Sequence, residues 1–467
     1  MNATLRNFSF AFASACPILL IAGSARAAEA PHQAGLVQIG CGAFVTHLNA
    51  AEAPHLAGLA QAAVSSDEVA SQAAIEQLRA AGPSGLEALL ALSPTPDSVQ
   101  AVQSTAAPPS RAGKTAEPKA PSSTSAEPDP AVVRWRSAVE AVAAQRDAVA
   151  SRLFWYTDFN QAQAAAKESG KPILSLHLLG RLTDEYSCAN SRFFRTVLYA
   201  NQEVSQRLRE RFVLHWNTVR QVPCVTIDFG DGRKLKRTIT GNSIHYVLDS
   251  RGQIVDALPG LYGPKAFLRA LDEAEAAARE TASLDAAASA EYLRKYHQSA
   301  AGKIKDLWRA DLQKLGALAP ADAASGEDEV ALERRSLDHW PRIAGLHAED
   351  AKLDAASIDL VRRDPPAVAA GALAMTKRKL EDPLLRVVAE FQISIGLDTV
   401  RNEYLLHRKV HQWLAEAPQP ELAQFNGRVY ADLFLMPLGD PWLGLAAPGV
   451  YSGLPGDGVV SESASAR

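Results

Sequence analysis

Cys188 occupies a position whose residue types and spacing could support thiol chemistry. The run Ser187-Cys188-Ala189-Asn190-Ser191 forms a C-x-x-S pattern, in which Ser191 can donate a hydrogen bond to the Cys188 sulfur but cannot form a disulfide with it. Large apolar residues recur at helical spacing from Phe193 to Leu198, which predicts that Cys188 begins a helix. Unpaired amide groups and the positive end of the helix dipole favour a thiolate there. We therefore expect a reactive sulfur with a lowered pKa, against the alternative of a small buried hydrophobic residue.

The remaining cysteines bear on how this thiol would react. Cys41 and Cys224 would accompany Cys188 in a chain that has lost its first 27 residues. Three is an odd number, so at least one thiol stays free or pairs between molecules in an oxidising compartment. Cys224 precedes an expected strand and could resolve a disulfide with Cys188, but a buried structural thiol is the favoured interpretation. We expect Cys188 to react with alkylating agents faster than Cys41 or Cys224.

Two histidines and a serine are candidates for the surroundings of the sulfur. His177 ends an expected strand before the Cys188 loop, and His245 follows Ser243 in another strand. Either imidazole could exchange a proton near the sulfur. Period-two alternation points both toward one sheet face, which favours packed residues with one ring nitrogen satisfied.

Glu403, His407 and His411 form a second pattern, E-x-x-x-H-x-x-x-H, on one expected helix. Residues four apart share a helix face, so the three side chains could meet a zinc-like ion. Apolar residues share that side of the helix, and the sequence shows no nearby fourth ligand. Two packed or hydrogen-bonded histidines are therefore favoured over a metal site, and we expect no cofactor.

An α/β pattern surrounds Cys188 and must position these side chains. Apolar runs predict buried strands at 171–179 and 212–216, and turn residues predict two hairpins, 225–239 and 244–255. A helix with proline in its first turn follows at 264–274. The order is strand, C-x-x-S helix, strand, paired strands and closing helix.

This order, over residues 152–274, resembles the thioredoxin-like superfamily, in particular exported domains that begin with an aromatic residue and an Ala-rich helix. The residues that carry the resemblance are Trp155-Tyr156, Ala162, Ala165-Ala166-Lys167, Gly170-Lys171-Pro172, Cys188, Val204, Leu208, Phe212-Val213, Val247-Leu248-Asp249, Gly252, Gly260 and Phe267-Leu268. The resemblance implies a thioredoxin-like α/β domain in which Cys188 and Ser191 hold the active-site positions. It also implies that Ser243, His245 and His177 border the substrate groove.

The sequence departs from that family at positions that matter for redox chemistry. Ser191 replaces the second cysteine, and Ser243 stands where the family has a cis-proline. The first hypothesis is therefore monothiol exchange, in which Cys188 forms a mixed disulfide with a protein partner. The second is a scaffold or binding module that kept the fold and lost redox chemistry, with the helical C-terminal region as its functional surface. The third is a metal-dependent site at Glu403, His407 and His411.

Composition divides the rest of the chain of 467 residues. Residues 1–27 resemble a signal peptide, with an apolar stretch followed by Ala25-Arg26-Ala27. A small helical segment is expected at 28–92, with two helices broken at Gly82-Pro83-Ser84-Gly85, and a disordered Pro/Ala/Ser-rich linker at 93–130. The α/β domain with a leading helix at 131–153 occupies 131–283, and a mostly helical region occupies 284–467.

The expected leader predicts export to the periplasm or the extracellular space. Its removal takes away Arg6 and Arg26 and no acidic residue, which changes the net charge from −4 to −6. Such mild acidity gives no reason to expect nucleic acid as a partner. With 47% hydrophobic and 21% charged residues, the composition is that of a globular protein, and no integral membrane span is expected after leader removal.

Overall fold

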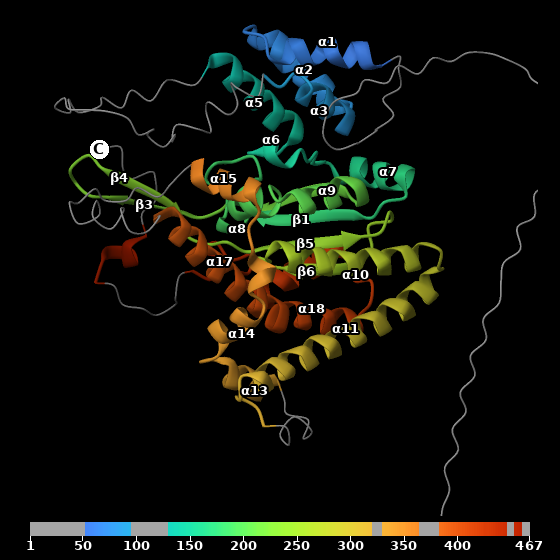
Figure 1. The fold of residues 1–467 in the computed structure, drawn as a ribbon, viewed down its shortest axis with the longest axis vertical. Helices are drawn as coiled ribbons and strands as arrows, with labels where there is room; N and C mark the ends of the chain where they lie inside the picture. The colour runs from blue at the N-terminus through green and yellow to red at the C-terminus, as the bar shows by residue number, and fades with distance from the viewer. Residues whose placement is uncertain (1–51, 95–128, 320–328, 364–382, 446–452, 460–467) are drawn as a thin grey trace, which may run out of the picture. The chain divides into compact units, whose positions relative to one another are not determined.

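Figure 1 shows the computed structural model, which describes residues 52–94, 129–319, 329–363, 383–445 and 453–459. These residues belong to one compact, mixed α/β unit that is mostly helical. The expected leader, Cys41 and most of the expected linker at 93–130 lie outside the described residues. Within the described ranges, no helix has the length and apolar character needed to cross a membrane.

The N-terminal part consists of short helices that share a small core. Helices α1 (Ala53–Ala63), α2 (Glu68–Ala80) and α3 (Pro83–Leu90) pack against α5 (Pro130–Ala143). The two helices expected on either side of residue 82 are confirmed, and Gly82 joins them with a φ of 69° that favours glycine. Helix α1 was not expected.

The leading helix expected at 131–153 breaks at Ala144, which has a φ of 52°. A short helix, α6 (Ala148–Ser151), follows. The break places the Gln145 side chain in the interior, where its amide oxygen accepts a bond from Trp155 Nε1 at 2.7 Å and its nitrogen donates to Ser151 Oγ at 2.9 Å. This network gives hydrogen-bond partners to the buried polar groups of Gln145, Ser151 and Trp155.

A four-stranded sheet forms the centre, in the order β2-β1-β5-β6. Strands β1 (Ile173–Leu179) and β2 (Val213–Arg220) are parallel, whereas β5 (Ser243–Leu248) and β6 (Ile254–Pro259) are antiparallel to their neighbours. Strands β1, β5 and β6 are buried along their whole length, which explains their nearly continuous apolar sequences.

The strand register corrects the expectation for the two histidines. His177 lies opposite Ile244, and His245 lies opposite Leu176. Because directly opposite residues share a face, His177 and His245 point to opposite faces of the sheet. The error arose because alternation within a strand does not fix the register between strands.

Different parts of the chain cover the two faces. On the His245 side lie Phe194 of the π-helical turn η1 (Phe194–Leu198), which continues α8 (Ala189–Phe193), and Phe267 of α10 (Pro264–Ala282). On the other side, the Tyr246 ring contacts Phe425 of α19 (Leu422–Arg428). Helices α7 (Phe159–Ser169) and α9 (Gln202–Arg211) pack beside β2.

The first expected hairpin forms a separate two-stranded sheet, β3 (Cys224–Asp228) with β4 (Lys234–Thr238). Figure 1 shows it extending away from the four-stranded sheet. Both its strands are largely exposed. The hairpin interrupts the chain between β2 and β5 without adding to the central sheet.

The C-terminal region is helical, as expected, and continues the core of the sheet. Its elements are α11 (Ala286–Lys314), α13 (Glu329–Ser336), α14 (Trp340–Leu346), the 3-10 turn η2 (Ala348–Ala351), α15 (Ala355–Arg363), α17 (Pro383–Arg401), the π-helical η3 (Asn402–His407), α18 (Arg408–Glu416), α19, the π-helical η4 (Val429–Leu433) and the 3-10 turn η5 (Pro455–Gly458). In their described part, α17, η3 and α18 form one continuous helical run. Helix α11 lies along α18 (Figure 1). One cluster of buried residues spans the sheet and these helices, so 131–283 and 284–467 share a core.

Candidate functional site

Cys188 caps the N-terminus of α8, as the sequence predicts, but it is completely buried. Its sulfur accepts a hydrogen bond from the Ser191 amide N–H at 3.4 Å, and Ser191 Oγ donates to the Cys188 carbonyl at 3.2 Å. Burial raises the pKa of the Cys188 thiol, and the hydrogen bonds from Ser191 and Asn190 only partly oppose this change. The expected lowering of the pKa is therefore wrong, because loss of hydration outweighs the helix start.

The segment that joins β4 to β5 covers this helix start. Asn190 Nδ2 donates to Ser243 Oγ at 3.1 Å, and the Ala189 amide donates to the Thr240 carbonyl at 3.4 Å. A second layer from the C-terminal region covers the segment in turn: Tyr430 Oη donates to the Asn242 carbonyl at 3.3 Å. Ser243 thus lies beside the Cys188 turn, as the resemblance implies, but the C-terminal region covers it.

The two histidines of the sheet pack as neutral aromatic residues. The His245 ring lies between Phe194 and Phe267, and its Nε2 is 2.7 Å from Tyr199 Oη. His177 packs edge-on against Tyr246. Burial lowers the pKa of each imidazole to about 3. Both residues are therefore packed as expected, and the expected bond to one ring nitrogen is confirmed for His245 but not for His177.

Cys224 is exposed at the start of β3, so the favoured interpretation of a buried structural thiol is wrong. Cys188 and Cys224 are both free thiols. The strand that Cys224 begins belongs to the exposed hairpin rather than to the core. Sequence alone did not distinguish a core strand from an exposed one, because the alternation of apolar and polar residues in β3 covers only five positions.

A cavity of about 170 Å³ opens between the sheet edge and the C-terminal helices. Strand β6, helices α10 and α11, and the run from α17 to α18 all contribute to its wall. Among the ionisable side chains that line it are Asp256, Arg269, Glu273, Lys303, Glu403 and His411. A concave surface that carries fixed polar groups is a usual place for a small ligand to bind.

His407 lies between two carboxylates at one wall of this cavity. Its Nδ1 is 3.1 Å from Glu403 Oε2, and its Nε2 is 3.4 Å from Asp256 Oδ1. Burial alone would lower the pKa of His407, but the two carboxylates raise it to about 10. His407 is therefore a buried cation at neutral pH, and the hydrogen-bonded interpretation of this residue is confirmed.

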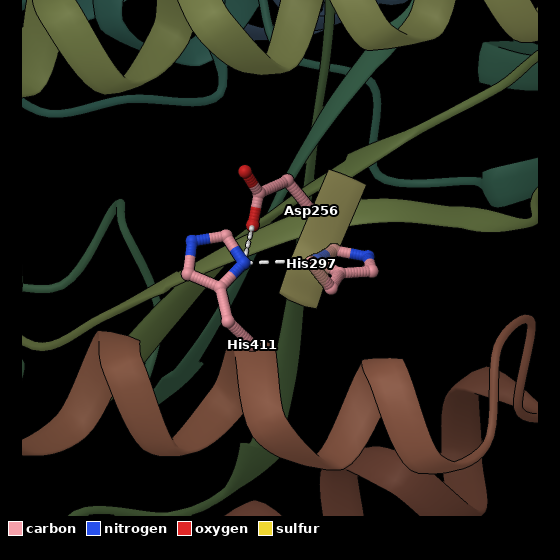
Figure 2. Close-up of side chains that lie close together, drawn as sticks. All are labelled: Asp256, His297 and His411. Carbon is pink, nitrogen blue, oxygen red and sulfur yellow. Dashed lines mark hydrogen bonds and ion pairs between the residues drawn. The ribbon is translucent and has the colours of Figure 1, made fainter. Parts of the chain in front are cut away.

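His411, one turn further along α18, faces a histidine from another helix (Figure 2). Its Nδ1 is 2.8 Å from His297 Nδ1 on α11 and 3.8 Å from Asp256 Oδ1 on β6. All three side chains are buried. Burial lowers the pKa of His297 to about 4 and that of His411 well below its ordinary value.

Asp256 is the residue that all these histidines share. Burial would raise the pKa of its carboxyl group, but His411, His407 and His297 together hold the pKa well below its usual range. Tyr296 Oη donates to Asp256 Oδ2 at 2.6 Å, and the Ala257 amide donates to Oδ1 at 2.8 Å. The carboxylate is therefore ionised and fixed in orientation.

The tertiary structure brings Asp256 and His297 to the stripe predicted from the sequence. Sequence reasoning missed both residues. Asp256 carried a signal, because an acidic residue inside an apolar strand must find a partner if it is buried. His297 carried none, since it lies on an amphipathic helix 114 positions before His411.

A second acid–histidine contact also borders the cavity. His347 Nε2 is 2.5 Å from Asp311 Oδ2, and Tyr404 Oη donates to the same oxygen at 2.6 Å. His347 and Tyr404 line the cavity. Two sets of hydrogen-bonded polar groups thus border the cavity, and both include residues of α11 and η3.

Comparison with known proteins gives no relative for this arrangement. No protein-family model, no curated protein and no solved structure matches the chain.

Proposed function

We propose that this protein is a redox-inactive binding module, built on a thioredoxin-like domain at residues 152–274, whose C-terminal helices form the binding site. The observation that carries the proposal is the contrast between two sites. Cys188 is completely buried, whereas ionisable side chains of the β6 edge and the C-terminal helices line an open cavity.

The order of elements supports the thioredoxin-like part of the proposal. Strand β1 leads to the helix that Cys188 begins, strand β2 follows in parallel, and the antiparallel pair β5 and β6 precedes the closing helix α10. This is the order that the resemblance implies for 152–274. The hairpin β3–β4 stands between β2 and β5, where it adds an exposed extension.

The surroundings of Cys188 argue against thiol exchange. A thiolate must reach the sulfur of its substrate, and the Cys188 sulfur is covered by the segment before β5 and then by the C-terminal region. Burial also disfavours the thiolate itself. Ser191 cannot resolve a mixed disulfide, so the local frame lacks both access and a second thiol.

The cavity suits a small polar ligand better than a protein chain. Its volume of about 170 Å³ is below the roughly 300–1,000 Å³ of pockets that hold drug-sized ligands. The Arg269 guanidinium is bound at 2.5 and 2.7 Å to both oxygens of Asp350. The site is therefore already organised by internal ion pairs before any ligand arrives.

Reaction of the native chain with glutathione disulfide tests the loss of redox chemistry. We expect mixed disulfide at the exposed Cys224 and none at Cys188, as located by peptide mass mapping after acid quenching. Cys224→Ser should lose the mixed disulfide at position 224, and Cys188→Ser should react as the wild type does. In denaturant both thiols should react. Formation of the Cys188 adduct in the folded protein would overturn the proposal in favour of monothiol exchange.

A further inference from the structure

We propose that Asp256, His297 and His411 bind a divalent transition-metal ion of the zinc class at the floor of the cavity. The inference does not depend on the redox state of Cys188 or on the proposed function. It differs from the stripe suggested by the sequence, because only His411 belongs to both sets.

The positions of the ligand atoms carry the proposal. One oxygen or nitrogen from each side chain lies within 4.8 Å of the others. His411 Nδ1 is 2.8 Å from His297 Nδ1 and 3.8 Å from Asp256 Oδ1, as Figure 2 shows. Ligand atoms of a tetrahedral zinc ion are about 3.3 Å apart. The His411–His297 distance is about 0.5 Å shorter than this value, and the His411–Asp256 distance is longer by about the same amount.

The surrounding hydrogen bonds already orient the carboxylate. Tyr296, the residue before His297, donates to Asp256 Oδ2, and the Ala257 amide donates to Oδ1. Groups that hold a ligand in this way are a regular part of metal sites, and they determine both affinity and geometry. His407 acts in the same role, because its two nitrogens contact Asp256 and Glu403.

The chemical types of the three side chains suit a cation. Two imidazoles and one carboxylate are ligand groups that Zn²⁺ takes in proteins. The other use of the same geometry is a single N–H···N hydrogen bond between His297 and His411, which needs no ion.

The cavity supplies a route and an open coordination position. Asp256 and His411 line it, so an ion held between them faces the open space. Three protein ligands with one free position are typical of zinc sites that bind water or a small anion. The same two-histidine, one-carboxylate set also suits Fe²⁺. Zn²⁺ is the probe that distinguishes a metal site from a hydrogen bond.

Zinc titration of the full chain, without an added histidine tag and after chelator treatment, tests the inference. We expect one Zn²⁺ per chain at pH 7, measured by isothermal titration, and a midpoint of thermal unfolding that rises with free Zn²⁺. His297→Gln and His411→Gln should each weaken binding at least about 100-fold, and Asp256→Asn at least about 10-fold. His55→Gln changes an exposed histidine of α1 outside the cavity lining and is the matched control, with unchanged affinity.

Spectroscopy with Co²⁺ keeps the test decisive if a variant unfolds. Visible absorption bands of tetrahedral Co²⁺ should appear in the wild type and in His55→Gln, and should disappear on addition of Zn²⁺. A wild-type chain that binds neither ion, or one whose affinity is the same in the folded double variant His297→Gln/His411→Gln, would overturn the metal site. That result would leave the hydrogen bond as the role of the pair.

Discussion

His407→Gln should remove a buried cation between two carboxylates and change how stability depends on pH. The His407 side chain is 5% exposed, and its nitrogens lie 3.1 and 3.4 Å from Glu403 and Asp256. Removing one member of a buried ion pair typically costs about 3–5 kcal/mol, because the remaining charge has no partner. We expect a loss of that order in the free energy of unfolding at pH 6.

The pKa of His407 leads to a similar magnitude independently. The folded value of about 10 lies above the unfolded value of about 6.5, so the folded protein holds the proton more tightly. At ~1.4 kcal/mol per pH unit, the difference corresponds to about 5 kcal/mol. This stabilisation is fully present below pH 6.5 and is lost as the pH rises to about 10.

Urea unfolding between pH 6 and 10, with a chelator present, measures the effect. The wild type should lose stability across this range more steeply than His407→Gln, and the two curves should converge near pH 10. Equal slopes in the wild type and His407→Gln would refute the assignment of His407 as a buried cation. Restored stability in His407→Gln/Glu403→Gln would locate the cost in the unpaired carboxylate.

Three further outcomes follow from the buried polar groups of the sheet and of the Cys188 turn. Tyr199→Phe removes the hydrogen bond of 2.7 Å to His245 Nε2 and should lower the free energy of unfolding, measured in urea, by about 1–3 kcal/mol. An unchanged free energy of unfolding would show that this bond makes no net contribution. His177 and His245 have pKa values of about 3 in the folded state, so both must take up protons on unfolding below pH 6.5. The free energy of unfolding should therefore fall as the pH drops from 6.5 toward 3, and His245→Phe should reduce that fall. Ser191→Cys should form a disulfide with Cys188 during folding, seen by mass spectrometry as the loss of two hydrogens; free thiols in the refolded variant under mild oxidant would show that the turn does not have thioredoxin-like geometry.

The sequence by itself determined the local elements. Apolar runs located β1, β5 and β6, turn residues located both hairpins, and helical spacing placed Cys188 at the start of a helix. These signals are local, since each depends on residues a few positions apart. Where the chain bends against such a pattern, as at Ala144, a buried side-chain network decided the outcome.

Tertiary structure decided which of these local features are able to react. Cys188 begins a helix, yet its pKa rises because segments from near residue 242 and residue 430 cover it. No local pattern reports such coverage, since it depends on chain segments distant in sequence. Cys224 shows the converse, because its strand belongs to a hairpin that leaves the core.

The cluster at the cavity shows the same division. The spacing of His407 and His411 put both on one helix face, which is a property of the helix period. Their partners come from β6 and α11, and the His297–His411 contact spans 114 positions. Only the packing of α11 along α18 against the edge of the sheet brings His297 and Asp256 to His411. The position of Asp256 inside an apolar strand indicates that its carboxylate needs a partner. Only the folded chain determines which residues are its partners.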